Sequence, residues 1–220
     1  MEAFECIKSR QSYRAFKPDP VPGETLQKIV EAASNSPSYT NTQPWEMAVV
    51  TGKKKDTLSQ KLLELAKANA PTSPDIPAPA SWPEQMLRRR EEHGARRLNT
   101  IGVKREDKEG REALRLMNYE FYGAPCVAFL FMDSSLGEWS IFDMGLFAQN
   151  LILTAYSLGV GSCIQASVTE YAKEIKEFLD VAEDKKLLVS IPMGYPAPDA
   201  VLNTYRSLKK APQEFVQWHG

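Results

Sequence analysis

The residues near the N-terminus that are best suited to chemistry are two arginines on either side of a hydroxyl, in the segment Arg10-Gln11-Ser12-Tyr13-Arg14. An arginine guanidinium donates a planar pair of hydrogen bonds that matches phosphate oxygens, and a serine hydroxyl adds one more donor. The segment could therefore hold a phosphate group. A solvated basic turn has the same composition, so these residues alone leave both interpretations open.

A second polar group lies in the stretch Asn35–Trp45, whose two prolines favour an extended, turn-like backbone. Asn41 and Gln43 each offer a donor and an acceptor, as the uracil-like edge of a flavin or a base requires. Ser36 and Ser38 can donate to a sugar chain. An ordinary loop between a helix and a strand is commonly built from the same residues, so that alternative also stays open.

The C-terminal tail carries Arg206, Lys209 and Lys210, which are more cations than a terminal tail needs for solubility. Cations from the tail could share one dianion with Arg10, because each charge-assisted contact contributes about 1.5–3 kcal/mol. Such a site requires the two chain ends to converge in space.

The overall composition excludes several other functions. A net charge of −1 over 220 residues argues against non-specific nucleic-acid binding, and 43% hydrophobic with 25% charged residues is typical of a soluble protein. Cys6, Cys126 and Cys163 are far apart and show no metal-binding spacing, so we expect no metal and a reducing, cytoplasmic setting. The apolar stretch Ile141–Val160 contains Asp143 and other polar residues, which favours a buried helix over a membrane span.

The hydrophobic pattern defines the elements that must position these residues. Helices are predicted at Ala3–Ser9, Gly23–Ser34, Lys53–Asn69, Pro83–His93, Arg105–Tyr122, Glu138–Leu158 and Glu170–Leu179. Strands are predicted at Glu46–Thr51, Cys126–Met132, Gly159–Ile164 and Lys186–Met193. The proline-rich stretch Ala70–Pro83 is predicted to be a surface excursion, and Trp82–Ile101 after it is our candidate for a substrate-shaping lid.

Four motifs in register carry a family resemblance. They are Arg10–Arg14, Pro37–Trp45, Gly159–Gln165 and the Arg206–Trp218 tail. Together they resemble the FMN-dependent nitroreductase family, over nearly the whole chain and most weakly between residues 67 and 111. For Gly159–Gln165 taken alone, a helix end followed by an edge strand is the alternative.

The resemblance implies an α+β fold with a central, mainly antiparallel sheet flanked by helices. It implies one domain over residues 1–220, with residues 67–111 as a variable lid. It also implies a homodimer in which the long helix Glu138–Leu158 lies against its twin, with FMN at the subunit boundary. That pairing fits the sequence, because a helix that is apolar almost all round needs cover on every side.

The same resemblance implies a set of site residues. The FMN-binding residues would be Arg10, Gln11, Ser12, Arg14, Pro37, Ser38, Tyr39, Asn41, Cys163, Ile164, Gln165, Ala166, Arg206 and Lys209. Arg10 and Ser12 would contact the phosphate and the ribityl chain, while Arg14 would approach the pyrimidine end of the ring. A backbone N–H within Ile164–Ala166, assigned to Gln165, would orient the ring at N5.

The chain departs from one branch of this family, which has Pro-Ile-Glu-Gly where this sequence has Cys163-Ile-Gln-Ala166. The exchange of Glu for Gln matters little if the backbone makes the contact with the ring. If a carboxylate is needed for proton relay, activity could shift.

The function that the resemblance implies is reduction of nitroaromatic or quinone-like acceptors with NAD(P)H as co-substrate. No Gly-x-Gly-x-x-Gly motif follows a strand, so NAD(P)H and a small aromatic acceptor would use one pocket in turn, which predicts ping-pong kinetics. Three alternatives stay open: a flavin-binding carrier or sensor without turnover, a reductive dehalogenase or flavin oxidase on the same scaffold, and an interaction protein without cofactor.

Overall fold

The computed structural model describes residues 2–220 of the chain. Its helices are α1 (Ala3–Ser9), α2 (Gly23–Ala33), α3 (Gly52–Lys67), α4 (Glu84–Thr100), α5 (Lys108–Leu116), α6 (Glu138–Ser157) and α7 (Ala172–Leu179). Its strands are β1 (Glu46–Thr51), β2 (Cys126–Asp133), β3 (Gly161–Ser162) and β4 (Lys185–Gly194). Within the described residues the strands form one sheet in the order β1-β2-β4-β3, and each neighbouring pair is antiparallel. The predicted α+β class is therefore confirmed.

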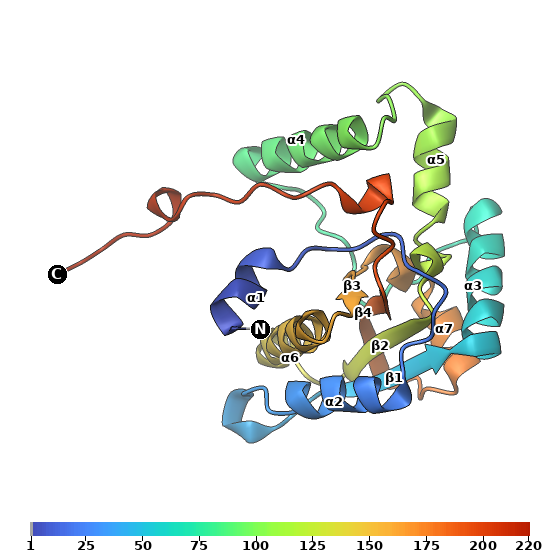
Figure 1. The fold of residues 1–220 in the computed structure, drawn as a ribbon. Helices are drawn as coiled ribbons and strands as arrows, with labels where there is room; N and C mark the ends of the chain where they lie inside the picture. The colour runs from blue at the N-terminus through green and yellow to red at the C-terminus, as the bar shows by residue number, and fades with distance from the viewer. Residues whose placement is uncertain (1) are drawn as a thin grey trace.

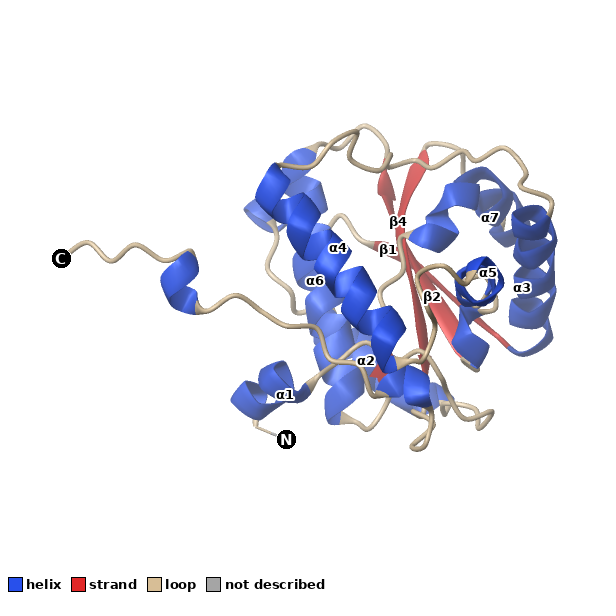
Figure 2. Ribbon diagram, turned by 90° about the horizontal axis from the view of Figure 1, so that it is seen from above, coloured by secondary structure: helices blue, strands red, loops and turns tan. Residues whose placement is uncertain are grey.

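Strand β2 lies inside the sheet, and its side chains alternate between two hydrophobic cores. Successive side chains of a strand point to opposite faces. Ala128 and Leu130 belong to the core that α2 and α6 cover, whereas Val127 and Phe129 belong to the core that α3 and α7 cover. Figure 2 shows these helices on the two sides of the sheet. This double burial explains why the β2 sequence is a continuous apolar run.

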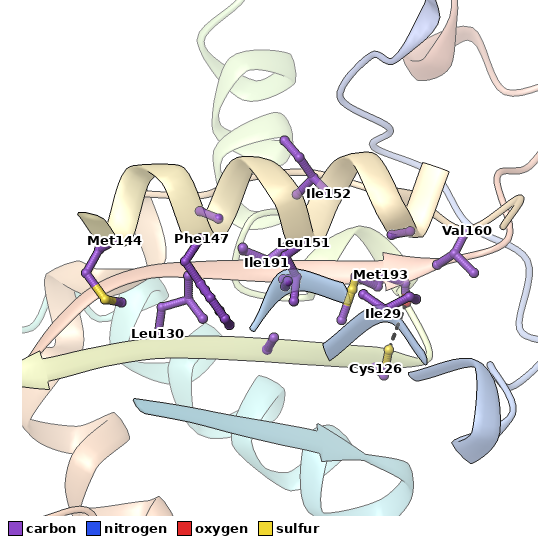
Figure 3. Close-up of a cluster of buried hydrophobic side chains, with 14 of the residues drawn as sticks. Ile29, Cys126, Leu130, Met144, Phe147, Leu151, Ile152, Val160, Ile191 and Met193 are labelled. Carbon is purple, nitrogen blue, oxygen red and sulfur yellow. Dashed lines mark hydrogen bonds between the residues drawn. The ribbon is translucent and has the colours of Figure 1, made fainter. Parts of the chain in front are cut away.

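Helix α6 crosses one face of the sheet. Figure 3 shows Met144 and Phe147 pointing from α6 toward the strands, and both side chains are almost fully buried. The opposite face of the helix is open to solvent, where Phe142 is 60% exposed and Trp139 is 66% exposed. The predicted cover on every side of this helix is thus not provided within one chain.

Several predicted boundaries were wrong. Helix α4 continues past His93 to Thr100, supported by the Arg96–Glu92 ion pair at 3.5 Å between side chains one turn apart. Helix α5 is confined to Lys108–Leu116, within the predicted Arg105–Tyr122. Phe121 and Tyr122 instead adopt left-handed φ values of 51° and 55°, because the chain must turn there to enter β2.

Two other elements are shorter than the sequence suggested. Of the predicted strand Gly159–Ile164, only Gly161 and Ser162 are in β3, because only these two pair with β4. The helix predicted from Glu170 begins as a 3-10 turn and becomes α-helical at Ala172.

The two ends of the chain run close to each other. Figure 1 shows α1 beside the C-terminal segment, and the last residues leave the body as an extended arm in both ribbon views. The guanidinium of Arg206 donates a 2.8 Å hydrogen bond to the backbone oxygen of Ser9. Within residues 2–220, no helix has the length and apolarity that crossing a membrane requires.

Candidate functional site

A cavity of about 600 Å³ lies between the N-terminal segment, helix α4 and the C-terminal segment, and we call it the basic cavity. Five of its lining side chains are cationic: Lys8, Arg10, Arg14, Arg206 and Lys209. Its other polar lining residues are Gln11, Ser12, His93, Tyr205 and Ser207. The described residues that line it include no carboxylate. The cations from the two chain ends thus meet at one site, as the sequence required.

The segment Arg10–Arg14 is held in place by β3. Ser12 forms an isolated parallel bridge with Ser162, and the Tyr13 N–H donates to the Ser162 oxygen at 3.0 Å. Gly161 is required by this close approach, because a Cβ at its position would lie 2.8 Å from the Tyr13 ring. The Tyr13 ring also stacks on Tyr156, with ring centroids 6.5 Å apart, near the C-terminal end of α6.

Asn203 fastens the C-terminal segment to the N-terminal one. Its Oδ1 accepts from the N–H groups of Arg14 at 2.8 Å and Ala15 at 3.2 Å. Its Nδ2 donates to the oxygens of Ala15 at 2.9 Å and Ala197 at 3.0 Å. The side chain is 8% exposed, so these bonds are shielded from water. This residue therefore sets the distance between the two groups of cations.

The charges around the basic cavity favour the binding of an anion. Among residues 2–220, no carboxylate lies within ion-pair distance of Arg10, Arg14 or Arg206. Burial and the charge of Arg14 lower the pKa of His93 below its ordinary value of 6.5, so this imidazole is neutral near pH 7. His93 Nδ1 lies 3.0 Å from the hydroxyl of Tyr205, which joins α4 to the C-terminal segment over the cavity.

The loop Cys163–Ala166 follows β3 directly and lies beside the Arg10–Arg14 segment. Burial raises the pKa of the Cys163 thiol, although Arg14 acts in the opposite direction, so Cys163 is a neutral thiol. Cys163 and Gln165 donate their N–H groups to β4, at 3.2 Å to Pro192 and 2.8 Å to Ser190.

These contacts correct the assignment of Gln165. Its N–H bonds to Ser190, so it is not free to orient a ring. N–H groups alternate in direction along an extended segment, and those of Ile164 and Ala166 have no partner within residues 2–220. The free donors of this loop are thus the two neighbours of Gln165.

The Gln165 side chain instead takes part in a buried polar network. It is 3% exposed, and its Nε2 donates to the oxygen of Asn118 at 3.2 Å. The Asn118 Oδ1 also accepts from the hydroxyls of Tyr122 at 2.7 Å and Ser167 at 3.0 Å. Asn118 therefore holds the loop Cys163–Ala166 in its conformation through buried hydrogen bonds.

The polar stretch Asn35–Trp45 lies at another place on the molecule. Both carboxylate oxygens of Asp143 accept from the Tyr39 N–H, at 3.0 and 3.1 Å, and the Tyr39 ring stacks on Trp139 at 5.5 Å. These contacts are near the N-terminal end of α6, whereas Tyr13 stacks on Tyr156 near the other end. At 1.5 Å per residue the two places are about 20 Å apart along the helix.

Within one chain, therefore, the predicted residues form two separate groups. Pro37, Ser38, Tyr39 and Asn41 are not brought to the basic cavity. Ser36 is also unavailable to a sugar, because it is 5% exposed and donates to the Ala33 oxygen at 2.6 Å.

The loop Asn35–Trp45 is strained. Thr40, Asn41 and Gln43 have φ values of 48°, 60° and 49°, which is unusual for Thr40 because its side chain is β-branched. Each such conformation costs on the order of 1–3 kcal/mol and persists only where the surroundings hold it. Asp143 and the Ser38 hydroxyl, which accepts the Gln43 N–H at 3.0 Å, supply that restraint.

Several residues that shape the site carry no recognisable motif in the sequence: His93, Asn118, Asp143, Asn203 and Tyr205. Each of them acts through contacts with residues that are distant from it in the sequence. The available signal was a single polar residue in an apolar context, such as Asp143 in α6. Lys210 does not line the basic cavity, whereas Arg206 and Lys209 do.

Comparisons with known proteins identify the family of this chain. The family model described as the Nitroreductase family matches residues 7–195. The nitroreductase NfnB of Mycolicibacterium smegmatis is 36% identical, over 93% of this chain and 87% of the relative. A 4-nitrobenzoate reductase of Pseudomonas putida is 32% identical, over 97% and 94%.

A solved structure agrees as well. The FMN-dependent nitroreductase NfnB from Mycobacterium smegmatis, in complex with NADPH, superimposes with a TM-score of 0.95 at 32% identity, covering 99% of this chain and 98% of the other. With four motifs in register, an antiparallel sheet between two helical layers and a family match over most of its length, this chain belongs to the nitroreductase family.

Proposed function

We propose that the protein is an FMN-dependent oxidoreductase that uses NAD(P)H to reduce nitroaromatic or quinone-like acceptors. The observation that carries the proposal is the meeting of Arg10, Ser12 and Arg14 with Arg206 and Lys209 in one cavity without a carboxylate. Membership of the nitroreductase family and the similarity to an FMN-dependent, NADPH-bound relative support it.

The residues of the basic cavity fit FMN. A phosphate dianion matches the guanidiniums of Arg10 and Arg206, which have no anionic partner of their own within the described chain. Gln11 lines the cavity, and its Oε1 is buried without a hydrogen-bond donor. A ribityl hydroxyl is the kind of donor that this oxygen lacks.

When bound, FMN supplies hydride transfer, taking a hydride from NAD(P)H and passing it to the acceptor. The protein then needs few catalytic side chains. Arg14 would stabilise the negative charge of the reduced ring, and the N–H groups of Ile164 and Ala166 replace Gln165 as our candidates for orienting it. Because both substrates use one cavity, double-reciprocal plots should give parallel lines.

We also propose that the active form is a homodimer. Along α6, Ile141, Phe142, Gly145 and Gln149 are exposed on one face, and a Cβ at Gly145 would have nothing within 4 Å. An open apolar face with a small residue at its centre suits close packing against a second helix. The extended C-terminal arm adds two exposed apolar side chains, with Phe215 at 65% and Trp218 at 89%.

A second copy would also complete the site. The loop that carries Tyr39 and Asn41 lies too far from the basic cavity of its own chain. If α6 pairs with its twin in an antiparallel sense, the loop of one protomer comes near the basic cavity of the other. The predicted FMN residues would then be contributed by both subunits.

The test begins with FMN binding. We expect Arg10→Gln and Arg206→Gln each to raise the dissociation constant of FMN about 10- to 100-fold, measured by quenching of flavin fluorescence. Lys210→Gln is the matched control, because Lys210 is exposed and does not line the cavity. Equal FMN affinity in all three variants would refute the assignment of the cavity.

Turnover is tested separately. Under anaerobic conditions NADPH should bleach the flavin absorbance near 450 nm within minutes, and an added nitroaromatic should restore it. A yellow protein that neither NADPH nor NADH bleaches would be a flavin carrier and not a reductase.

A further inference from the structure

One arginine of helix α4 faces the protein interior without a partner. Arg97 lies one turn after His93, which lines the basic cavity, and residues four apart share a helix face. The Nη2 atom of Arg97 is buried and has no hydrogen-bond partner within residues 2–220. By contrast, Arg88 and Arg96 of the same helix pair with Glu84 and Glu92.

The charge of Arg97 acts on two groups that the charge of Arg14 also acts on. Burial raises the pKa of the Cys163 thiol and of the Tyr122 hydroxyl, and the two arginines act in the opposite direction on each group. Arg14 belongs to the N-terminal segment and Arg97 belongs to α4. Both cations therefore lie near Cys163, the first residue of the loop where we place the flavin ring.

The negative charges of FMN have cationic partners other than Arg97. Arg10, Arg206 and Lys209 lie together at the chain ends and suit the phosphate, and Arg14 suits the negative charge of a reduced ring. Leaving a buried guanidinium N–H without an acceptor is unfavourable, and the cavity lining offers no carboxylate. The missing acceptor would thus be an oxyanion that arrives with the second substrate.

We propose, building on the function proposed above, that Arg97 binds an oxyanion group of the molecule that enters over the flavin. A guanidinium donates in a fixed planar fork that matches a carboxylate or a phosphate. Two sources fit this chemistry: a carboxylate on the aromatic ring of the acceptor, and the 2′-phosphate that distinguishes NADPH from NADH. Either one makes Arg97 a specificity-determining residue.

The experiment uses the FMN-loaded protein and the variants Arg97→Gln and Arg97→Lys. The ratio of kcat/KM for 4-nitrobenzoate to kcat/KM for 4-nitrobenzamide isolates the carboxylate, since the two acceptors have nearly the same shape. The ratio of kcat/KM for NADPH to that for NADH isolates the 2′-phosphate. Binding is read independently from the change in flavin absorbance on titration with benzoate and with benzamide.

We expect Arg97→Gln to lower one of the two ratios by about tenfold or more, while Arg97→Lys keeps part of it because the charge remains. A fall in the first ratio, with weaker benzoate binding, identifies the acceptor carboxylate. A fall in the second identifies the 2′-phosphate. Arg88→Gln is the control, because Arg88 lies on the same helix with its side chain 70% exposed.

If Arg97→Gln changes neither ratio, or lowers both members of each pair equally, the inference is wrong. That result is distinguishable from failure of the proposed function. A wild-type protein that binds no FMN, or that neither NADPH nor NADH reduces, would refute the function itself. A wild-type protein that is active but whose selectivity does not depend on Arg97 would refute only the inference.

Discussion

Asn203 shows how one residue without any reactive group can determine a binding site. Its amide bonds to the backbone of Arg14 and Ala15 on one side and of Ala197 on the other. These bonds hold together the N-terminal and C-terminal segments, whose cations line the basic cavity. Because the amide is buried, water cannot replace the lost partners after a substitution.

We expect Asn203→Ala to lower the free energy of unfolding by about 2–3 kcal/mol, because it leaves several buried backbone groups without partners. FMN affinity should fall with it, since the two groups of cations are no longer held together. Urea denaturation and fluorescence titration measure the two effects. Thr204→Ala, at the exposed neighbouring position, should change neither, and an Asn203 variant of wild-type stability would contradict this account.

A second prediction concerns the effect of His93 on the pH dependence of the free energy of unfolding. Its pKa is lowered in the folded protein by burial and by Arg14, whereas the unfolded chain titrates near 6.5. Below pH 6.5 the unfolded state therefore binds more protons, so the free energy of unfolding falls as the pH drops through the folded pKa. Above pH 6.5 His93 is neutral in both states, and it no longer lowers the free energy of unfolding.

We expect the loss of stability between pH 7.5 and pH 5 to be smaller in His93→Gln than in the wild type. Urea denaturation at the two pH values measures it. His219→Gln replaces the other histidine, which is exposed in the tail, and should keep the wild-type pH dependence. An identical loss in wild type and His93→Gln would show that His93 does not contribute.

Helix α6 carries contacts along its length that serve different parts of the candidate site. It holds the strained loop Asn35–Trp45 through Asp143, in its N-terminal half, and through Asn150, in its C-terminal half, which donates to the Ser36 hydroxyl at 2.8 Å. Its C-terminal end supports Tyr13 and with it the segment Arg10–Arg14 through Tyr156. One rigid helix thus fixes two groups of residues about 20 Å apart.

Asp143→Ala should release the loop, because the Tyr39 N–H loses its acceptor and the left-handed residues lose a restraint. We expect hydrogen exchange of the amides between residues 36 and 43 to accelerate about tenfold or more. Ser157→Ala, at the exposed C-terminal end of α6, should leave their exchange unchanged. Unaltered exchange in Asp143→Ala would mean that the loop is held by other contacts.

The open face of α6 and the C-terminal arm both support the homodimer that we propose. The apolar face contains Phe142 and Gly145, and the arm ends near the almost fully exposed Trp218. The two predicted halves of the FMN site are also on different parts of one chain. Dimerisation and cofactor binding should therefore be coupled.

Gly145→Arg tests this coupling. The side chain has room in the single chain, because nothing lies within 4 Å of a Cβ there, so the fold should persist. In a helix pair the arginine prevents close approach, so we expect a monomer by light scattering and a large loss of bound FMN. Gln27→Arg, exposed on α2, should stay dimeric with FMN bound. A Gly145→Arg dimer that retains FMN would exclude α6 pairing.

Much of the fold could be predicted because it follows from local pattern. The apolar run Cys126–Met132 and the amphipathic helices predicted their elements, since burial requires a fixed side-chain period. Failures occurred where tertiary contacts override local preference. Phe121 and Tyr122 left the helical conformation because the chain had to turn into β2, and the helix predicted to end near His93 ran on to Thr100.

The family, the α+β class and the residue types at the site follow from the sequence, because four motifs and the hydrophobic periodicity are local properties of the chain. Which N–H groups remain free depends on tertiary contacts, since the Gln165 N–H donates to Ser190 of β4. Tertiary contacts also leave the Arg97 Nη2 atom without a hydrogen-bond partner within residues 2–220 and separate Asn41 from Arg10. Pairing and distance depend on how remote segments pack, and no local pattern encodes them.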